Sequence, residues 1–163
     1  MQKSQLSTKQ IGLIALFILA FAACGYFREY YFVQINNIMY MKYYHMVSHL
    51  AVGLLMQPFQ HLSYDFLYYS KYPATLTWTA IFFFLNYALL RTLSGDALLL
   101  RMLIIGYCLM LLLAGASMLY GYLINDRLQS DEYTLSRWLL GIAQGPIPGL
   151  LLLAAGRLRR GLD

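Results

Sequence analysis

The longest apolar run in the chain is LLLRMLIIGYCLMLLLAGASMLYGYLI, Leu98–Ile124. A hydrocarbon core of about 30 Å needs about 20 apolar residues in helical form, so this run can cross a bilayer with a tilt. Three shorter apolar runs occupy residues 11–27, 73–90 and 134–156. The sequence therefore predicts an all-α membrane protein in which four transmembrane helices form one integral membrane domain, residues 1–163.

The overall composition supports this class and excludes others. Hydrophobic residues make up 60% of the chain and charged residues 12%, whereas soluble domains average about 25% charged residues. The formal net charge is +5, but the basic residues do not form a stripe with spaced aromatics, so no nucleic-acid partner is predicted. The two cysteines, Cys24 and Cys108, both lie in apolar runs and indicate neither a disulfide framework nor a zinc site.

Lysine and arginine predict the orientation of the chain. If the N-terminus is cytoplasmic, the short segments on that side carry seven basic residues: Lys3, Lys9, Arg91, Arg101, Arg157, Arg159 and Arg160. The longer connections on the other side carry five: Arg28, Lys42, Lys71, Arg127 and Arg137. The positive-inside rule then places both termini in the cytoplasm. If the source is bacterial, the protein lies in the inner membrane and residues 28–72 face a periplasm-like space.

The connection between the first two spans, residues 28–72, holds nine of the 15 tyrosines and all three histidines. Tyrosine collects at the membrane–water interface, where the ring can be half buried and the hydroxyl wet. We therefore expect an aromatic, partly helical extracytoplasmic cap on or against one membrane face. Helical spacing predicts that one aromatic face of the cap contains Tyr40, Tyr43 and Tyr44.

Two local signals mark boundaries around this cap. Asn36 and Asn37 favour a turn or a helix cap after the first span. Pro73 suits the first turn of the second span, where a missing N–H removes no hydrogen bond.

The N-terminus has a second interpretation. Basic residues, an apolar run and Phe21-Ala22-Ala23-Cys24 are together typical of a lipoprotein signal that ends in a lipidated cysteine. The residues after Cys24 continue the apolar run, and Phe21 is unusual in such signals. An uncleaved first span is therefore favoured.

Small and polar residues in the spans indicate how the helices pack. Gly141, Gly145 and Gly149 form a small-residue stripe in the fourth span, which would let helices approach closely within the chain or across a homodimer or partner interface. Asn86 and Gln144 are amides deep in apolar runs and are expected to hydrogen-bond across helices.

Pro146 and Pro148 interrupt the fourth span next to Gln144. A proline frees the carbonyl four residues before it, which a buried neighbour or a polar cavity must satisfy. A broken, polar helix is also how transporters build a midplane site, and a transporter using Asn86, Gln144 and this break stays open as an alternative.

A polar cluster is predicted at the outer interface, from Arg28, Glu29, Asn36 and Arg137. Either arginine could pair with an acidic residue near the membrane surface, where the effective dielectric is below that of bulk water. Structural pairing is the expected role of this cluster.

Two candidate chemical sites lie in the cap or next to it. His45, His49, His61 and Asp65 form two pairs with helical i,i+4 spacing, and three imidazoles with a carboxylate could bind zinc or iron in a membrane-bound metal or redox enzyme subunit. Pro58 prevents one continuous helix between the pairs, so interfacial histidines without a metal are favoured and no cofactor is expected. Arg28, one turn after Cys24, could activate that thiol, but a buried structural cysteine is the stronger interpretation.

Two groups of residues resemble a known family. The first is Arg28, Glu29, Phe32, Ile35, Asn36, Tyr40, Tyr43 and Tyr44; the second is Tyr133, Leu135, Ser136, Arg137, Gly141, Gln144, Pro146 and Pro148. This pattern is similar to the exosortase-associated small bacterial membrane proteins, which accompany membrane-embedded sorting proteases. The resemblance implies a non-enzymatic accessory subunit that binds a larger integral membrane protein and assists protein sorting or surface-polymer export.

Overall fold

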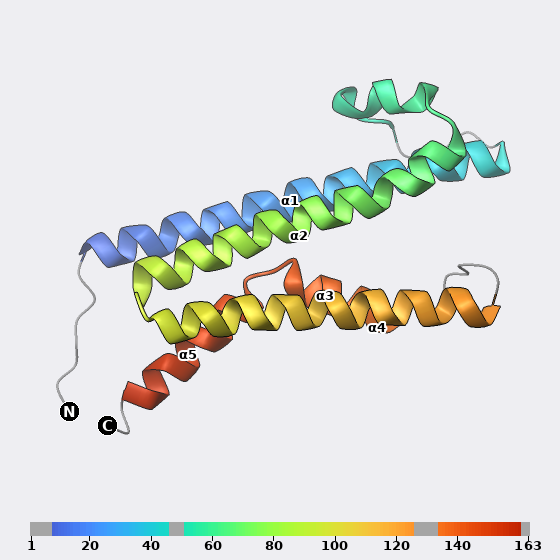
Figure 1. Ribbon diagram of the computed structural model, residues 1–163. Helices are drawn as coiled ribbons and strands as arrows, with labels where there is room; N and C mark the ends of the chain where they lie inside the picture. The colour runs from blue at the N-terminus through green and yellow to red at the C-terminus, as the bar shows by residue number, and fades with distance from the viewer. Residues whose placement is uncertain (1–7, 46–50, 126–133, 161–163) are drawn as a thin grey trace. The chain divides into compact units, whose positions relative to one another are not determined.

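The computed structural model describes residues 8–45, 51–125 and 134–160 (Figure 1). Every element in these ranges is a helix, and they contain no strand, which confirms the all-α prediction. The elements are α1 (Thr8–Tyr44), the 3₁₀ helix η1 (Leu54–His61), α2 (Tyr64–Leu93), α3 (Ala97–Asn125), α4 (Thr134–Ala143) and α5 (Ile147–Arg160).

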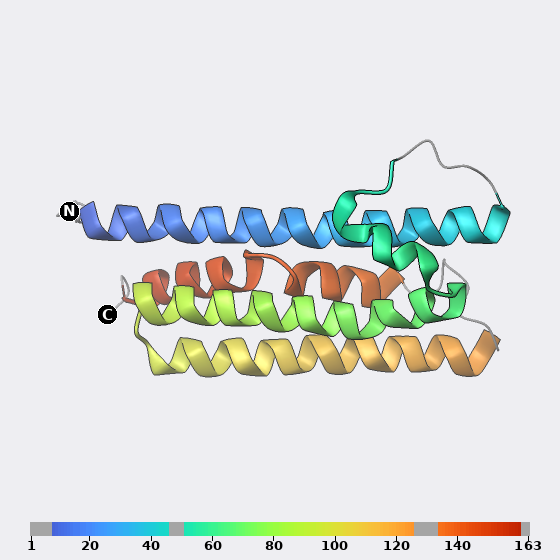
Figure 2. The ribbon, with the colours of Figure 1, turned by 90° about the horizontal axis from the view of Figure 1, so that it is seen from above.

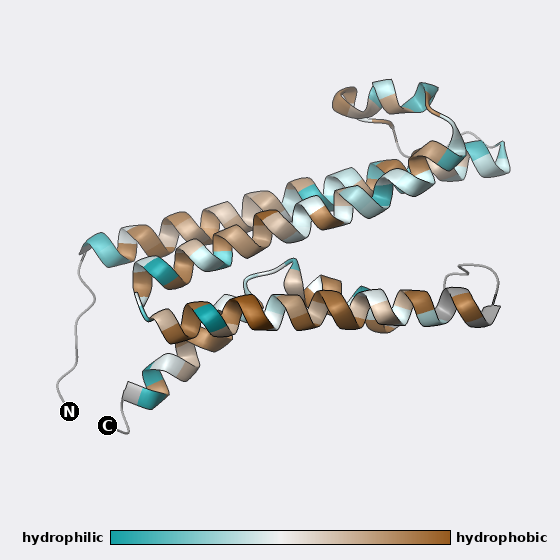
Figure 3. Cartoon of the chain, viewed as in Figure 1, coloured by the Kyte–Doolittle hydropathy of each residue, from teal (hydrophilic) through white to brown (hydrophobic). Residues whose placement is uncertain are grey.

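Three of the described helices, α1, α2 and α3, are long and apolar enough to cross a membrane, and α4 with α5 is a fourth candidate if the pair forms one span. The axes of α4 and α5 differ by 65°. Figure 2 shows the short break between the two helices. The predicted span 134–156 is thus not one straight helix. Figure 3 shows that apolar residues cover most of α3 and much of α1 and α2, as in a membrane protein.

Contacts along the chain divide it into two compact units. Unit 1 contains Met1–Phe21 and Thr79–Asp163, and unit 2 contains Ala22–Trp78. Helices α1 and α2 each contribute residues to both units. The predicted cap, residues 28–72, falls entirely within unit 2.

Helices α1 and α2 are longer than predicted. Asn36 and Asn37 lie inside α1, which continues to Tyr44, and Pro73 lies inside α2, nine residues after its start at Tyr64. The expected turn at the asparagines and the expected helix start at Pro73 are therefore wrong. The physical reason is tertiary: Ile35, Ile38 and Met39 have helical spacing and are buried together, which outweighs the local turn preference of asparagine.

Unit 2 has its own small core, made of Ile35, Ile38 and Met39 from α1, Met56 from η1 and Leu67 from α2. The chain entering η1 is held against α1 by Gln34. Its Nε2 donates to the Ala51 carbonyl at 3.4 Å, and its Oε1 accepts from the Gly53 N–H at 3.3 Å. Gly53 is packed so closely on the Tyr30 ring that a Cβ would overlap it.

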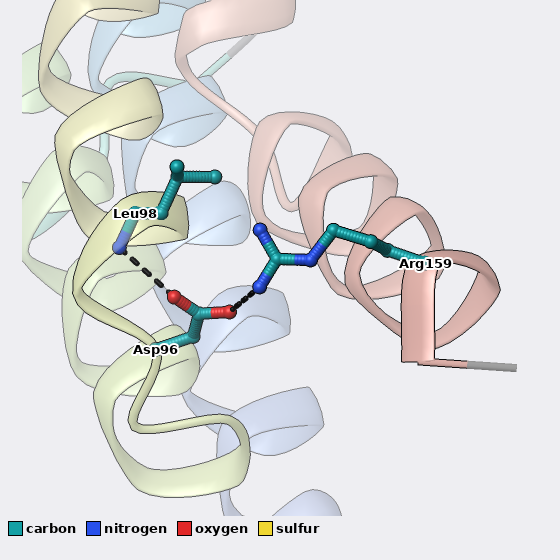
Figure 4. A network of polar contacts seen from close by, with 3 residues as sticks. All are labelled: Asp96, Leu98 and Arg159. Atoms are coloured by element: carbon teal, nitrogen blue, oxygen red, sulfur yellow. Dashed lines mark hydrogen bonds and ion pairs between the residues drawn. The ribbon is translucent and has the colours of Figure 1, made fainter. Parts of the chain in front are cut away.

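In unit 1, α3 packs against both α4 and α5. The tight turn from α2 to α3 uses Gly95, whose φ of 64° is in the left-handed region and whose N–H donates to the Leu90 carbonyl at 3.1 Å. Asp96 caps α3, because its Oδ1 accepts from the Leu98 N–H at 2.9 Å. Its Oδ2 forms an ion pair with Arg159 of α5 at 2.7 Å (Figure 4).

Candidate functional site

Asn86 of α2 is fully buried and makes hydrogen bonds to both sides of the α4–α5 break. Its Nδ2 lies 2.9 Å from the Gly145 carbonyl, 3.0 Å from the Tyr107 hydroxyl and 2.9 Å from the carbonyl of Phe82, one turn earlier on α2. Its Oδ1 accepts from the Gly149 N–H at 3.0 Å. An amide has two N–H groups, so three acceptors share two hydrogens.

Tyr107 of α3 completes this arrangement. Its hydroxyl donates to the Ala143 carbonyl at 2.7 Å, leaving its oxygen free to accept from Asn86. The Phe83 ring packs edge-on against the Tyr107 ring with centroids 5.0 Å apart, and Leu90 and Leu103 bury it further. Tyr107 is not among the residues predicted from the sequence, in which the only signal for it is a phenol within the run Leu98–Ile124.

The break explains why these polar groups are buried here. Pro146 and Pro148 have no N–H, so they supply no helical donor to the carbonyls of Ile142 and Gln144, four residues before them. Helix α4 ends at Ala143 and α5 begins at Ile147, so the carbonyls of Ala143 and Gly145 also lie where the helix is interrupted. Leaving a carbonyl without a hydrogen bond in hydrocarbon costs roughly several kcal/mol of free energy. Side chains from neighbouring helices must therefore replace the lost donors. Asn86 and Tyr107 do this for Gly145 and Ala143.

Gln144 stands at the same break. Its Nε2 donates to the Thr79 hydroxyl of α2 at 2.9 Å, while its backbone N–H closes the last turn of α4 on the Leu140 carbonyl. The hydrogen bonds across helices expected for Asn86 and Gln144 are thus present. The groups of Asn86 that a midplane substrate site would use are engaged with the backbone of the break.

The three glycines of the predicted stripe have different surroundings. Gly141 lies in α4 on an open face, Gly145 lies in the break and Gly149 lies in α5, so they do not share one continuous helix face. Gly149 is the only one of the three at which an added Cβ would meet another helix. A Cβ there would overlap Asn86 Oδ1 and lie 3.3 Å from Leu89 Cδ2.

Of the predicted outer cluster, Arg28 and Glu29 form an ion pair of neighbours at 3.2 Å. Asn36 is exposed two turns further along α1, and Arg137 is exposed in the first turn of α4 in unit 1. Within unit 2, Arg28 and Glu29 are therefore in contact and Asn36 lies apart from them along α1.

The cap histidines are not gathered around a common point in the described residues. His45 directly follows α1, His61 ends η1 and Asp65 lies in the first turn of α2, all exposed to the surface. His49 lies outside the described residues. Within residues 8–45, 51–125 and 134–160, no three His, Cys, Asp or Glu side chains are placed to hold a metal ion.

A chain of tyrosine rings runs over the surface of unit 2, and we call it the tyrosine cluster: Tyr40, Tyr43, Tyr44, Tyr64, Tyr68, Tyr69 and Tyr72. Neighbouring centroids are 4.6 to 6.4 Å apart, including a contact of 5.9 Å between Tyr43 of α1 and Tyr64 of α2. The predicted aromatic face of α1 is one end of this cluster. Its continuation on α2 depends on the pairing of two helices, which spacing within one helix does not reveal.

No model of a protein family, no curated protein and no solved structure matches this chain. The resemblance to exosortase-associated membrane proteins therefore stays a prediction.

Proposed function

We propose that this protein is a non-enzymatic accessory subunit of a bacterial inner-membrane complex, and that its tyrosine cluster binds a larger integral membrane protein. The exposure of the rings is the observation that carries this proposal. Tyr40, Tyr43, Tyr44 and Tyr69 are 52%, 64%, 54% and 65% exposed, although they belong to a continuous aromatic surface.

The distance of the tyrosine cluster from the expected membrane boundary supports a protein partner rather than an aromatic belt at the membrane interface. At 1.5 Å per residue, Tyr43 lies about 22 Å along α1 from Arg28, the first charge after its apolar run. Tyr64 lies about 10 Å along α2 from Lys71, the corresponding charge on that helix. The headgroup layer on each side is about 5–7 Å thick, so this end of the cluster projects into water. A projecting helical pair fits these lengths better than a cap lying flat on the membrane.

The exposed rings are not needed to close the core of unit 2, which is built from Ile35, Ile38, Met39, Met56 and Leu67. Aromatic side chains left in water are enriched where proteins bind one another, and tyrosine often contributes a large share of the binding energy. A contiguous patch of such rings is therefore suited to a protein surface with matching apolar pockets.

The predicted orientation puts both chain ends in the cytoplasm and the tyrosine cluster outside. In this orientation the partner has an extracytoplasmic part that reaches the cluster. Because of the resemblance to exosortase-associated proteins, the first partner to test is an exosortase-type sorting protease. The complex would then act in protein sorting or surface-polymer export.

The test is a pull-down of the tagged protein in mild detergent, with metal analysis of the same eluate. We expect one larger membrane protein in stoichiometric amount. The double variant Tyr43→Ala, Tyr44→Ala should reduce its recovery at least about tenfold, because hot-spot residues each contribute about 1–2 kcal/mol or more. Tyr120→Ala, at an exposed tyrosine on α3 of unit 1, is the matched control and should not change recovery.

Two results would contradict the proposal. The protein could elute alone with about one equivalent of zinc or iron, which would direct attention to the cap histidines. Alternatively, recovery of the partner could be equal for the double variant and for Tyr120→Ala, which would exclude the tyrosine cluster as the binding surface.

A further inference from the structure

Two arginines lie at the same level of the α2–α3 hairpin in unit 1. The Asn86–Tyr107 hydrogen bond and the Phe83–Tyr107 ring contact fix the antiparallel register of these helices. Arg91 and Arg101 each lie five residues from Asp96 in the turn, on opposite sides of it. The two guanidinium groups are therefore carried by neighbouring helices at one height.

A third arginine approaches this level from α5. Asp96 pairs with Arg159, and a Cβ on Gly156 would lie 2.6 Å from Leu99 Cδ1, so the end of α5 runs beside the start of α3 (Figure 4). Arg157 lies between these two contacts. Because a helical turn spans about 5.4 Å, Arg157 is within about one turn of the level of Arg101.

Among the described residues, this end of unit 1 has no carboxylate left to neutralise the three arginines. Asp96 is the only acidic residue of unit 1 within the described ranges, and both of its oxygens are engaged, by Leu98 and by Arg159. Arg91, Arg101 and Arg157 are exposed and have no ion pair in the described part of the chain. Their charges are thus available to an anion from outside the protein.

The surroundings indicate which anion this is. Arg101 is flanked on α3 by the exposed apolar side chains of Leu98, Met102 and Ile105. Arg91 lies two turns from the exposed Phe84 on the same face of α2. Arginines at the edge of an exposed apolar belt extend to the boundary between acyl chains and headgroups, where lipid phosphates are the anions present.

We propose that Arg91, Arg101 and Arg157 bind the phosphate groups of an anionic phospholipid. A guanidinium group donates two parallel hydrogen bonds to phosphate oxygens, which suits it to this ligand. Three arginines that no described carboxylate neutralises favour a lipid with net negative charge over a zwitterionic one, whose ammonium group would be repelled. The acyl chains of the same lipid cover the apolar side chains around the arginines.

The full-length protein, stripped of lipid in detergent, tests this by native mass spectrometry and by thermal unfolding with added lipid. Phosphatidylglycerol or cardiolipin should bind and raise the unfolding temperature, and phosphatidylcholine should not. The variant Arg91→Gln, Arg101→Gln should weaken anionic lipid binding about 20- to 30-fold, since each basic group contributes roughly fivefold. Arg137→Gln removes an exposed arginine near the start of α4 and should leave binding unchanged.

Inorganic phosphate, added alone at the same concentration, should produce no shift, because it cannot cover the apolar belt. If the double variant does not fold, Arg101→Gln alone should weaken binding about fivefold, while Arg101→Lys should keep most of it. Equal binding of phosphatidylcholine, an effect of inorganic phosphate as large as that of the lipid, or equal loss with Arg137→Gln would overturn the proposal.

Discussion

At the scale of single residues, the side chain of Asn86 satisfies backbone groups on both sides of the α4–α5 break. The sequence predicted a hydrogen bond across helices for this residue, because an amide deep in an apolar run needs polar partners. It did not predict the partners. Those depend on the register of α2 against α4 and α5, which no local pattern contains.

Asn86→Leu should lower the free energy of unfolding by about 1–3 kcal/mol, because the Gly145 carbonyl and the Gly149 N–H lose their partner while the side-chain volume changes little. The measurement is reversible unfolding in mixed micelles. Asn36→Leu makes the same chemical change at an exposed position of α1 and should alter stability by no more than about 0.5 kcal/mol. An Asn86→Leu variant as stable as the natural protein would show that the hydrogen bonds at the break add nothing.

At the scale of elements, the close approach of α5 to α2 occurs at one glycine. Gly149→Ala should destabilise the protein by about 1–3 kcal/mol, because the new methyl group overlaps Asn86. Gly141→Ala, on the open face of α4, should be neutral or should stabilise by up to about 1 kcal/mol, since alanine favours the helix. Unfolding of the two variants under identical conditions separates these outcomes, and equal effects would contradict the assigned contacts.

The boundaries of the elements show what the sequence could and could not predict. The four apolar runs identified the helices, because bilayer thickness sets the number of apolar residues that a span requires. The ends of α1 and α2 in unit 2 were missed, because Asn36, Asn37 and Pro73 are turn signals when read locally. Burial of Ile35 and Ile38 against Leu67 stabilises the helical conformation beyond these local signals. The buried residues come from segments about 30 residues apart, so a local pattern does not contain this information.

At the scale of the whole molecule, the pairing of Asp96 with Arg159 bears on topology. The start of α3 and the end of α5 meet, while α4 follows the far end of α3 in the chain. We therefore expect α4 and α5 to cross the bilayer as one broken span and the two chain ends to share one side.

Single cysteines introduced at Gly95→Cys and Leu158→Cys should then react with a membrane-impermeant reagent from the same side of oriented vesicles. A cysteine at Tyr44→Cys, beyond the outer end of the first span, should react only from the opposite side. The background for each variant is the chain with Cys24 and Cys108 replaced by alanine. Labelling of Gly95→Cys and Leu158→Cys from opposite faces would show that α4 and α5 instead form a re-entrant loop.

The contact between Gly149 and Asn86 also has an evolutionary consequence. Gly149 has no side chain, and this makes room for the amide of Asn86. A mutation at either position therefore changes which residues are tolerated at the other. In descendants of this chain, a larger residue at position 149 should become fixed only together with a smaller one at position 86. Such a replacement would also need a new donor for the Gly145 carbonyl, or the loss of Pro146 and Pro148. The four positions should therefore change as a group.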